Sequence, residues 1–383
     1  MATVIEAELI RFAQELVKLR SYTGQEKELA MFIKDKMTQL AYDQVKVDGL
    51  GNVFGVIGNG PTKILFDSHI DTVEVNDAVQ WSVGAFSGAI VNGKLYGRGA
   101  VDMKSAVAAS VYAGHAIKKL GLDKGKTIYI STSVMEEDYD GEPVHYLLEN
   151  SGIRPDYAII CEPSNSQLAL GHKGRALIKV DVQGVSAHGS APEKGVNAVY
   201  KMNAIIKRVE ALGQKFMGIQ GDRGSLALTK IDSDAVSLNA IPDHCRIYLD
   251  RRLVMGEDEQ GLAQEMELLL DGTDATWEIH SVAGKSWKGE DIVLHSFLPA
   301  WEIDEAHELT TACVSAFEEL NGCKPRMTTW DFSTNGVATS KRGIPTIGFG
   351  PGDDKLAHSR DEHCPVSAIV RAFEFYTNLV AHF

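Results

Sequence analysis

Short apolar segments that end abruptly in acidic or histidine side chains recur along this chain, and they constrain its fold more than any other feature. The first runs into the stretch DSHIDTV, which places His69 between two aspartates. A helical pattern at 106–120 separates the first two apolar segments, so strands alternate with helices. This alternation is typical of an α/β fold in which helices cover a largely buried sheet. The apolar segments are residues 64–66, 127–134, 157–161 and 346–349.

The middle of the chain has a different pattern, in which strands and helices do not alternate strictly. This favours an inserted α+β unit with a four-stranded antiparallel sheet and two helices. Its predicted strands are residues 176–182, 226–231, 244–253 and 276–282. We therefore predict an α/β fold with two parts. A catalytic domain with a twisted central sheet flanked by helices covers residues 1–174 and 285–383, and the inserted unit, here called the lid, covers residues 175–284.

Charge and cysteine content exclude several classes of protein. The formal net charge is −14, so nucleic acid and anionic membrane surfaces are repelled. Glu6 and Glu8 stand where a signal peptide needs apolar residues, and the longest apolar stretch is too short to span a bilayer. Five dispersed cysteines without a CxxC pair argue against a disulfide framework and a cysteine zinc site. We expect a cytoplasmic protein with no nucleic-acid or membrane partner.

The polar residues at the strand ends predict a metal site. In open α/β sheets, ligands bind at the carboxyl ends of the strands, where two histidines and several carboxylates of this chain would meet. Carboxylates so close together repel one another unless a cation compensates their charge. Histidine and carboxylate ligands without cysteine suit zinc, manganese or cobalt.

The spacing within these motifs suggests distinct roles for neighbouring residues. Residues i and i+2 of a strand share a face, so Asp71 is placed to hydrogen-bond the ring nitrogen of His69 that faces away from the metal. Glu136 and Glu137 are adjacent and must point differently, so one can bind metal while the other faces the substrate. The acids that follow, Asp138, Asp140 and Glu142, are interpreted as solvated turn charges.

Five motifs together resemble a known family. They are HxD after a strand, GRGxxDMK at 97–104, the Glu136-Glu137 pair, CEP at 161–163 and AHxxxE at 357–362. Their order and spacing resemble the dinuclear zinc family of acetylornithine deacetylase, succinyl-diaminopimelate desuccinylase and the glutamate carboxypeptidases. Further stretches, among them EEDYDG, GHKGR and WDFSTNGV, are most similar to the uncharacterised selenium-metabolism-linked hydrolase branch.

The resemblance implies a role for each residue of the metal centre. His69 and Glu162 would bind one divalent ion, Glu137 and His358 the other, and Asp102 would bridge the two. Glu136 would be the general base and Asp71 would orient His69. The resemblance implies two zinc ions, with cobalt or manganese as alternatives.

The resemblance also implies that the lid closes over the site and forms a homodimer. His188, in GVSAHG, would reach the partner subunit's site and stabilise an oxyanion. Arg252 in LDRR would contact a substrate carboxylate, although Arg251 is adjacent, and Asn239 in SLNAIP would contact substrate. Where many members carry an aspartate, this chain has the stretch Ser333 to Gly336, in which Thr334 is the expected substrate contact.

The function predicted from these features is metal-dependent hydrolysis of an amide bond in a small substrate with a free carboxylate, such as an N-acyl amino acid or a dipeptide. One alternative is an N-carbamoyl-amino-acid hydrolase, which cleaves a similar C–N bond. A second alternative is a catalytically silent, metal-stabilised binding protein of the same fold. The intact set of ligands together with Glu136 argues against the silent protein.

Overall fold

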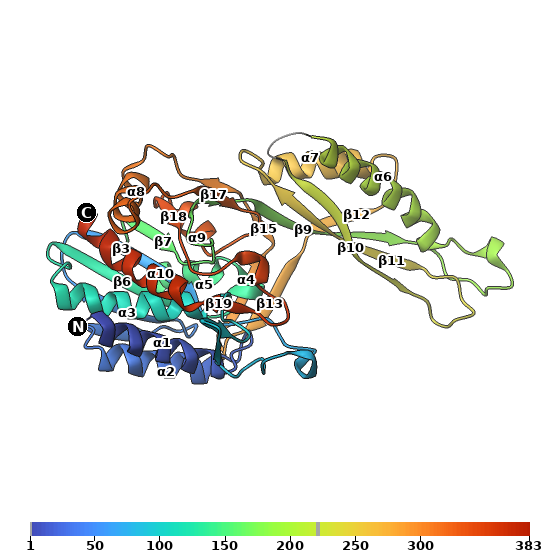
Figure 1. The fold of residues 1–383 in the computed structure, drawn as a ribbon. Coiled ribbons are helices and arrows are strands. Elements are labelled where there is room, and N and C mark those ends of the chain that lie inside the picture. The colour runs from blue at the N-terminus through green and yellow to red at the C-terminus, as the bar shows by residue number, and fades with distance from the viewer. Residues whose placement is uncertain (1, 220–222) are drawn as a thin grey trace.

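The computed structural model describes residues 2–219 and 223–383 of the 383. The chain forms a larger globular part, which carries both ends of the described chain, and an elongated lid that projects from it (Figure 1). The hydrophobic residues of the two parts form separate clusters, so each part has its own core. In the described ranges, no helix is long and apolar enough to cross a membrane.

The larger part is built on a sheet of nine strands within the described residues. Its strand order is β1-β2-β6-β3-β7-β18-β8-β16, and β17 also pairs with β8. Strand β3 is parallel to β6 on one side and to β7 on the other, and β7 is parallel to β18. The strands are β1 (Gln44–Val47), β2 (Val53–Gly58), β3 (Thr62–His69), β6 (Lys126–Ser133), β7 (Tyr157–Ile160), β8 (Leu168–His172), β16 (Trp301–Glu302), β17 (Met327–Trp330) and β18 (Thr346–Gly348).

Helices cover this sheet as the apolar periodicity predicts. Helix α3 is buried along most of its length and packs on β3 and β6, with α1 and α10 over it. In α1, the residues Leu9, Phe12 and Leu16 recur at helical spacing and are all buried. The helices of this part are α1 (Ala2–Lys18), α2 (Lys27–Gln39), α3 (Lys104–Leu120), α4 (Glu136–Tyr139), α5 (Glu142–Asn150), α8 (Glu308–Asn321), α9 (Gly336–Ser340) and α10 (Val366–Leu379).

The lid contains the antiparallel sheet and the two helices that the sequence predicts. Its strand order is β10-β11-β9-β12, and burial alternates strictly along β9 and β11, because one face is covered by helices and the other is not. Asn197 and Asp258 cap the two helices through their side chains. The elements are β9 (Gly174–Gln183), α6 (Ala198–Gly218), β10 (Ser225–Asp234), β11 (His244–Leu253), α7 (Glu259–Leu270) and β12 (Thr276–Ile279).

The chain returns from the lid in two steps that the sequence pattern does not predict. Residues 276–282 form two strands, because β13 (Ser281–Lys285) leaves the lid sheet and pairs with β14 (Asp291–His295). This ribbon packs on the larger part, and Ile292 and Leu294 join its core. The short β15 (Phe297–Leu298) then pairs with β9 again. The predicted domain boundary at 284/285 lies inside β13.

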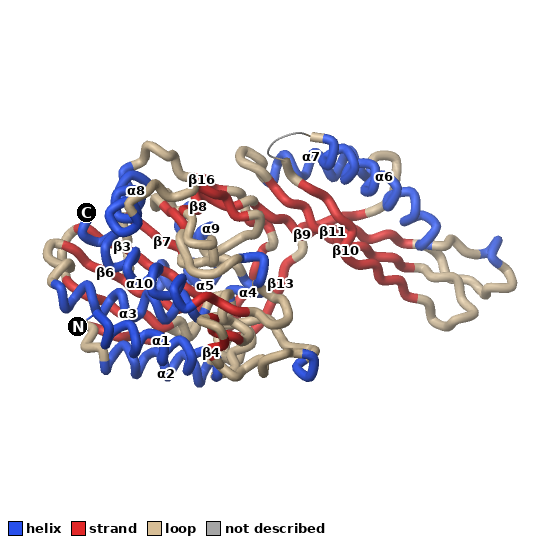
Figure 2. Tube along the Cα trace, viewed as in Figure 1, coloured by secondary structure: helices blue, strands red, loops and turns tan. Residues whose placement is uncertain are grey.

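A small sheet of three strands joins the end of the chain to the region before α3. It consists of β4 (Ile90–Val91), β5 (Lys94–Tyr96) and β19 (His363–Pro365) within the described ranges. Strand β19 pairs with β5, so the loop that carries His358 lies beside the loop that carries Asp102. Figure 2 shows the separate sheets of the two parts in red.

Candidate metal centre

The structure brings the six predicted residues of the metal centre to one end of the large sheet. His69 is the last residue of β3, Glu136 and Glu137 open α4 directly after β6, and Glu162 follows β7. Because β3, β6 and β7 are parallel neighbours, their carboxyl ends lie at the same edge. Asp102 precedes α3 and His358 lies between β18 and β19.

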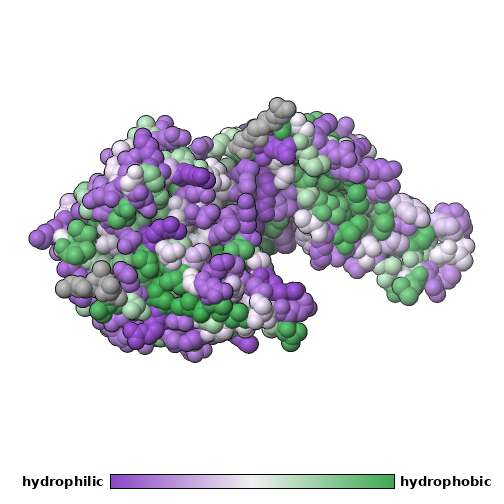
Figure 3. Space-filling model, viewed as in Figure 1, coloured by the Kyte–Doolittle hydropathy of each residue, from purple (hydrophilic) through white to green (hydrophobic). Residues whose placement is uncertain are grey.

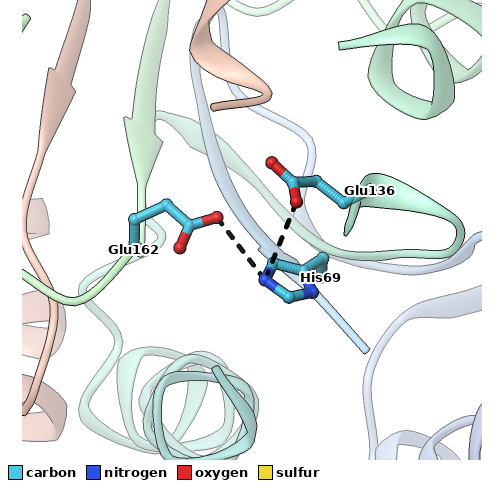
Figure 4. Close-up of side chains that lie close together, drawn as sticks. All are labelled: His69, Glu136 and Glu162. Atoms are coloured by element: carbon cyan, nitrogen blue, oxygen red, sulfur yellow. Dashed lines mark ion pairs between the residues drawn. The ribbon is translucent and has the colours of Figure 1, made fainter. Parts of the chain in front are cut away.

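His69 lies at the centre of the first group of ligand atoms. Its Nε2 atom is 2.8 Å from Asp102 Oδ1, 3.6 Å from Glu162 Oε1 and 3.9 Å from Glu136 Oε2. Figure 4 shows both glutamate carboxylates pointing at this one ring nitrogen. The geometry therefore places Glu136 about as close to His69 as the predicted ligand Glu162.

His358 and Glu137 form a second group around the other oxygen of Asp102. His358 Nε2 lies 3.1 Å from Asp102 Oδ2 and 3.0 Å from Glu137 Oε2. Asp102 thus directs one carboxylate oxygen at each histidine, which is the arrangement that a bridging carboxylate requires. Two overlapping sets, His69 with Glu136 and Glu162, and His69 with Asp102 and Glu137, have ligand atoms within 4.8 Å of one another.

The donor atoms have the spacing of a metal coordination sphere. Ligands about 2.0–2.1 Å from a tetrahedral zinc ion lie roughly 3.3 Å apart, and the separations around His69 and His358 scatter about that value. All six side chains offer oxygen or imidazole nitrogen, which zinc, manganese and cobalt accept. The residues present therefore fit two divalent cations, with Asp102 between them.

The pKa values of the cluster show that it needs positive charge. Burial, together with repulsion from neighbouring carboxylates, raises the pKa of Glu136 and of Glu162 well above the usual value. Burial and the charge of Asp102 raise the pKa of Glu137 to about 7. Hydrogen bonds to Asp102 and Glu137 raise the pKa of His358 to about 10. A bound cation would offset the repulsion between these carboxylates and favour their ionised forms.

Asp71 supports the centre, but mainly in a way that strand spacing did not predict. Its carboxylate accepts hydrogen bonds from the backbone N–H groups of Glu136 at 3.0 Å and Glu137 at 3.1 Å, and from the Thr23 hydroxyl at 2.9 Å. The Nδ1 atom of His69 donates to the backbone carbonyl of Asp71 at 3.0 Å and lies 3.4 Å from its carboxylate. Asp71 therefore holds the start of α4, and its main chain orients His69 with Nε2 toward the metal.

An ion pair that the sequence analysis missed joins the Asp102 loop to the His358 loop. Arg98 Nη1 donates to Glu362 Oε2 at 2.6 Å, and both side chains are buried. The other oxygen of Glu362 accepts from the backbone N–H groups of Val101 and Asp102. Arg98 also donates to the backbone carbonyl of His358. Arg98 lies in the GRGxxDMK motif and Glu362 in the AHxxxE motif. Their place in these motifs is the sequence signal that could have identified them.

A cleft of about 410 Å³ opens beside the metal-binding residues. Asp140 lines it, is 5% exposed, and accepts a hydrogen bond from Ser333. The interpretation of Asp140 as a solvated turn charge was therefore wrong, because the tertiary fold covers that turn. Arg175 and Arg252 also line the cleft, from the lid strands β9 and β11.

The structure separates the two candidate arginines of LDRR. Arg251 lies on the helix-covered face of β11, where it is ion-paired to Glu257 and Glu265. Arg252 lies on the open face and reaches the cleft. The apolar alternation of Cys245, Ile247, Leu249 and Leu253 already places position 251 on the covered face, so this signal was present in the sequence.

Thr334 does not line the cleft, contrary to its expected role as a substrate contact. Thr334 is fully buried, its backbone N–H donates to His172 Nδ1 at 2.9 Å, and its hydroxyl lies 3.1 Å from the same atom. Its neighbour Ser333 faces the cleft instead. Asn335 is also buried, and its amide joins Asp67 to Gly141. The loop is directed by these buried contacts, which the local sequence does not specify.

His188 and Asn239 lie together in the lid, away from this cleft. An isolated bridge pairs His188 with Ala240, and Gly189 N–H donates to the carbonyl of Asn239. Both side chains are exposed, and neither lines the cleft of its own chain. The ring of His188 hydrogen-bonds the Ser190 hydroxyl at 2.7 Å.

This geometry defines the class of site: a cluster of carboxylates and histidines, suited to two metal ions, at the edge of an α/β sheet. The sequence profile of peptidase family M20/M25/M40 matches residues 65–382, so the chain belongs to that family. It is accordingly a metal-dependent hydrolase of the peptidase and deacylase type.

The relatives match nearly the whole chain. The chain is 37% identical to the uncharacterised protein YgeY of Escherichia coli K12, over 97% of this chain and 93% of that protein. It is 24% identical to succinyl-diaminopimelate desuccinylase 2 of Shewanella loihica, over 98% and 100%.

Two solved structures have the same fold. A tripeptidase of Staphylococcus aureus gives a TM-score of 0.77 at 20% identity, over 98% of both chains. A dinuclear metal-binding M20 peptidase of Bacillus subtilis gives 0.71 at 14% identity, over 99% of this chain and 98% of that chain.

Proposed function

We propose that this protein hydrolyses the amide bond of a small substrate that carries a free carboxylate, such as an N-acyl amino acid or a dipeptide. The observation that carries the proposal is Asp102, whose two oxygens face two histidines, each with a further carboxylate beside it. The relatives named for desuccinylase and deacetylase activities, and the structural neighbours named as peptidases, support cleavage of a C–N bond.

The five ligands are assigned as the family resemblance implies, and the distances between their donor atoms are compatible with this assignment. His69 and Glu162 would hold one cation, and Glu137 and His358 would hold the other. Asp102 is shared, and zinc is the ion that we favour for both positions. When bound, two divalent ions polarise a scissile carbonyl and lower the pKa of a water molecule.

Glu136 is assigned as the general base, and Glu137 as a ligand, because the family resemblance implies these roles for the two positions. The carboxylate of Glu136 lines the cleft, where substrate and water have access. It would take a proton from the attacking water and return it to the leaving amine. Asp71 would hold Glu136 in place through the backbone bond to α4.

The exposed position of His188 supports a homodimer. His188 is remote from the cleft of its own chain, so an oxyanion-stabilising role requires a second chain or a large closure. Strand β10 is an edge strand whose outer side has no partner among the described residues. Ile231 within it and Val236 and Leu238 just after it are exposed. Figure 3 shows hydrophobic surface along the lid. A second lid covering this edge would explain both features.

The remaining assignments are part of the same proposal. Residues 1–174 and 285–383 form the catalytic domain and residues 175–284 the lid, with the ribbon of β13 and β14 as the connection between them. Arg252 and Asn239 contact substrate, and Ser333 replaces Thr334 in that role. The protein acts in the cytoplasm on a small molecule and does not bind nucleic acid or membrane.

The test combines metal content with turnover on one preparation. Metal would be measured by plasma mass spectrometry, and dipeptides, N-acetyl amino acids and N-carbamoyl amino acids would be assayed for amine release. Two equivalents of metal with chelator-sensitive turnover of acetyl or dipeptide substrates would support the proposal. Turnover of carbamoyl substrates alone would replace it with the carbamoylase, and a fully loaded protein without turnover would favour the binding protein.

A further inference from the structure

Two arginines from the lid face the metal-binding carboxylates across the cleft, and they are direct neighbours. Arg175 in β9 pairs with Arg252 in β11 in the antiparallel register, and both line the cleft. Side chains at such positions start only about 5 Å apart, and like charges directly opposite each other destabilise a strand pair. The stability of the lid sheet therefore does not explain this pair of residues.

The two arginines differ in how well they are already paired. Arg252 donates to both oxygens of Asp250, at 2.8 and 3.1 Å. The nearest acidic atom to Arg175 is an Asp140 oxygen 3.7 Å away, beyond hydrogen-bond distance, and the other oxygen of Asp140 is bound by Ser333. The Nε atom of Arg175 is buried without an acceptor among the described residues.

Two other arginines of the lid are paired with carboxylates more closely than Arg175 is. Arg251 is bound by Glu257 and Glu265, and Arg246 donates to Asp181 at 2.8 Å. A buried donor without an acceptor costs free energy, so Arg175 is poised for a partner that the chain itself does not supply. Because Arg175 lines the cleft, an acceptor that enters the cleft can reach its guanidinium group.

We propose that Arg175 binds the free carboxylate of the substrate together with Arg252, and that this pair, the arginine clamp, makes the carboxylate a requirement for binding. The planar guanidinium fork matches a carboxylate, and two forks approaching from neighbouring strands discriminate strongly against a neutral carboxamide. The substrate would then extend from the metal-binding residues to the first strand of the lid. This inference rests on the proposed function, since it specifies the substrate of the same site.

The test compares acids with their carboxamides, so that only the carboxylate differs. Alanine, methionine and glutamate, each as the free acid and as the α-carboxamide, would be titrated calorimetrically into zinc-loaded protein. The wild-type protein is expected to prefer the acid by about tenfold or more. Any contribution of the metal ions to this preference is common to all variants and cancels when the acid-to-amide ratios are compared.

Three variants separate the clamp from a structural role of Arg175. Arg175→Met should reduce the acid-to-amide ratio to within about twofold, and Arg175→Lys should retain part of it. Arg246→Met is the matched control. Arg246 lies on the same face of β11 as Arg252, but it is paired with Asp181 and does not line the cleft. Its ratio should equal that of the wild type.

The outcomes distinguish the clamp from the proposed function. An unchanged ratio in Arg175→Met, or a wild-type protein that binds acid and amide equally, would overturn the clamp. Hydrolysis in which Arg175→Met slows acid and amide substrates equally would also overturn it and leave the function intact. A ratio that depends on Arg175, in a protein that hydrolyses no C–N bond of the substrate panel, would support the clamp and reject the function.

Discussion

The metal centre and the region around His188 are both built from polar residues, but they differ in how those residues are held. At the metal centre His69, Asp71 and Glu362 are buried, and each contacts residues from distant parts of the sequence. In the lid, His188 and Asn239 are exposed, and the ring of His188 contacts the nearby Ser190. The candidate metal ligands of the first region lie together within one chain, whereas His188 and Asn239 do not line the cleft of their own chain.

Replacing Glu136 or Glu137 singly by glutamine tests the roles assigned to this pair at the metal centre. These substitutions should have the largest effect on turnover or metal content. Glu136→Gln removes the base but leaves the predicted ligands, so kcat should fall by about 10²–10⁴-fold with metal content unchanged. Glu137→Gln removes a ligand and should lower the metal content itself. Both would be followed by turnover and plasma mass spectrometry. Loss of metal from Glu136→Gln would show that Glu136 is a ligand and would invalidate the assignment of base.

Complementation between variants tests whether the lid acts on a partner. His188→Ala should lower kcat by about 10²–10³-fold if the histidine stabilises an oxyanion. Mixed with Glu136→Gln chains, it should recover up to about a quarter of wild-type activity, because a mixed dimer contains one site with both residues. Activity would be measured after verified subunit exchange, and no recovery from verified mixed dimers would place His188 outside the partner's site.

The Arg98–Glu362 pair should have an intermediate effect, since it acts on the metal through the loops of Asp102 and His358. Glu362→Gln keeps the shape of the side chain but loses the ion pair, so metal affinity should fall by about 10–100-fold. Competition with a chelator would measure it. Glu319→Gln, at an exposed pair with His382, is the control and should leave the affinity unchanged.

The smallest predicted effect is a pH dependence of stability at the junction of the two parts. Burial lowers the pKa of His172 to about 3, below the usual value of 6.5, so the folded protein excludes a proton that the unfolded chain binds. His172 therefore contributes less stability as pH falls from about 6.5 toward 3, by up to about 1.4 kcal/mol per pH unit.

Denaturant unfolding of metal-free protein at pH 7, 6 and 5 checks this prediction. His172→Gln should be less stable than wild type at pH 7, by about 2 kcal/mol, because the hydrogen bonds to Thr334 and Pro299 are disturbed. The difference should shrink toward pH 5. A difference that stays constant over this range would show that His172 is not buried in its neutral form.

The clustering of the candidate metal ligands could be predicted from the sequence because most of these polar residues lie at or just after the end of a strand. An apolar run that ends in DSHID or in VMEED shows both a buried strand and its polar carboxyl end, and parallel pairing brings such ends together. The two separate cores and the alternation of the lid strands could also be predicted, because they follow from the local pattern of apolar residues. The same alternation also distinguishes Arg251, on the covered face of β11, from Arg252, on the open face.

Other features depended on contacts between distant residues and were not predicted. Asp140 is buried because Ser333, 193 positions away, hydrogen-bonds it, and Thr334 is buried because His172 accepts from its backbone. The ribbon of β13 and β14 leaves the lid because Ile292 and Leu294 pack into the other core. Nothing in the local sequence distinguishes these residues from solvated turn residues or lid strands.

The sequence by itself determined the α/β architecture with its inserted lid, and the residues that meet at the carboxyl ends of the strands. Periodicity and polarity encode these features, since they depend on which face of each element is apolar. Only the tertiary structure decided which oxygen of Asp102 faces which histidine, that Glu362 and Arg98 join the two loops, and that Arg175 faces the cleft beside Arg252. These features depend on side-chain directions across separate elements, which a linear pattern of residues does not specify.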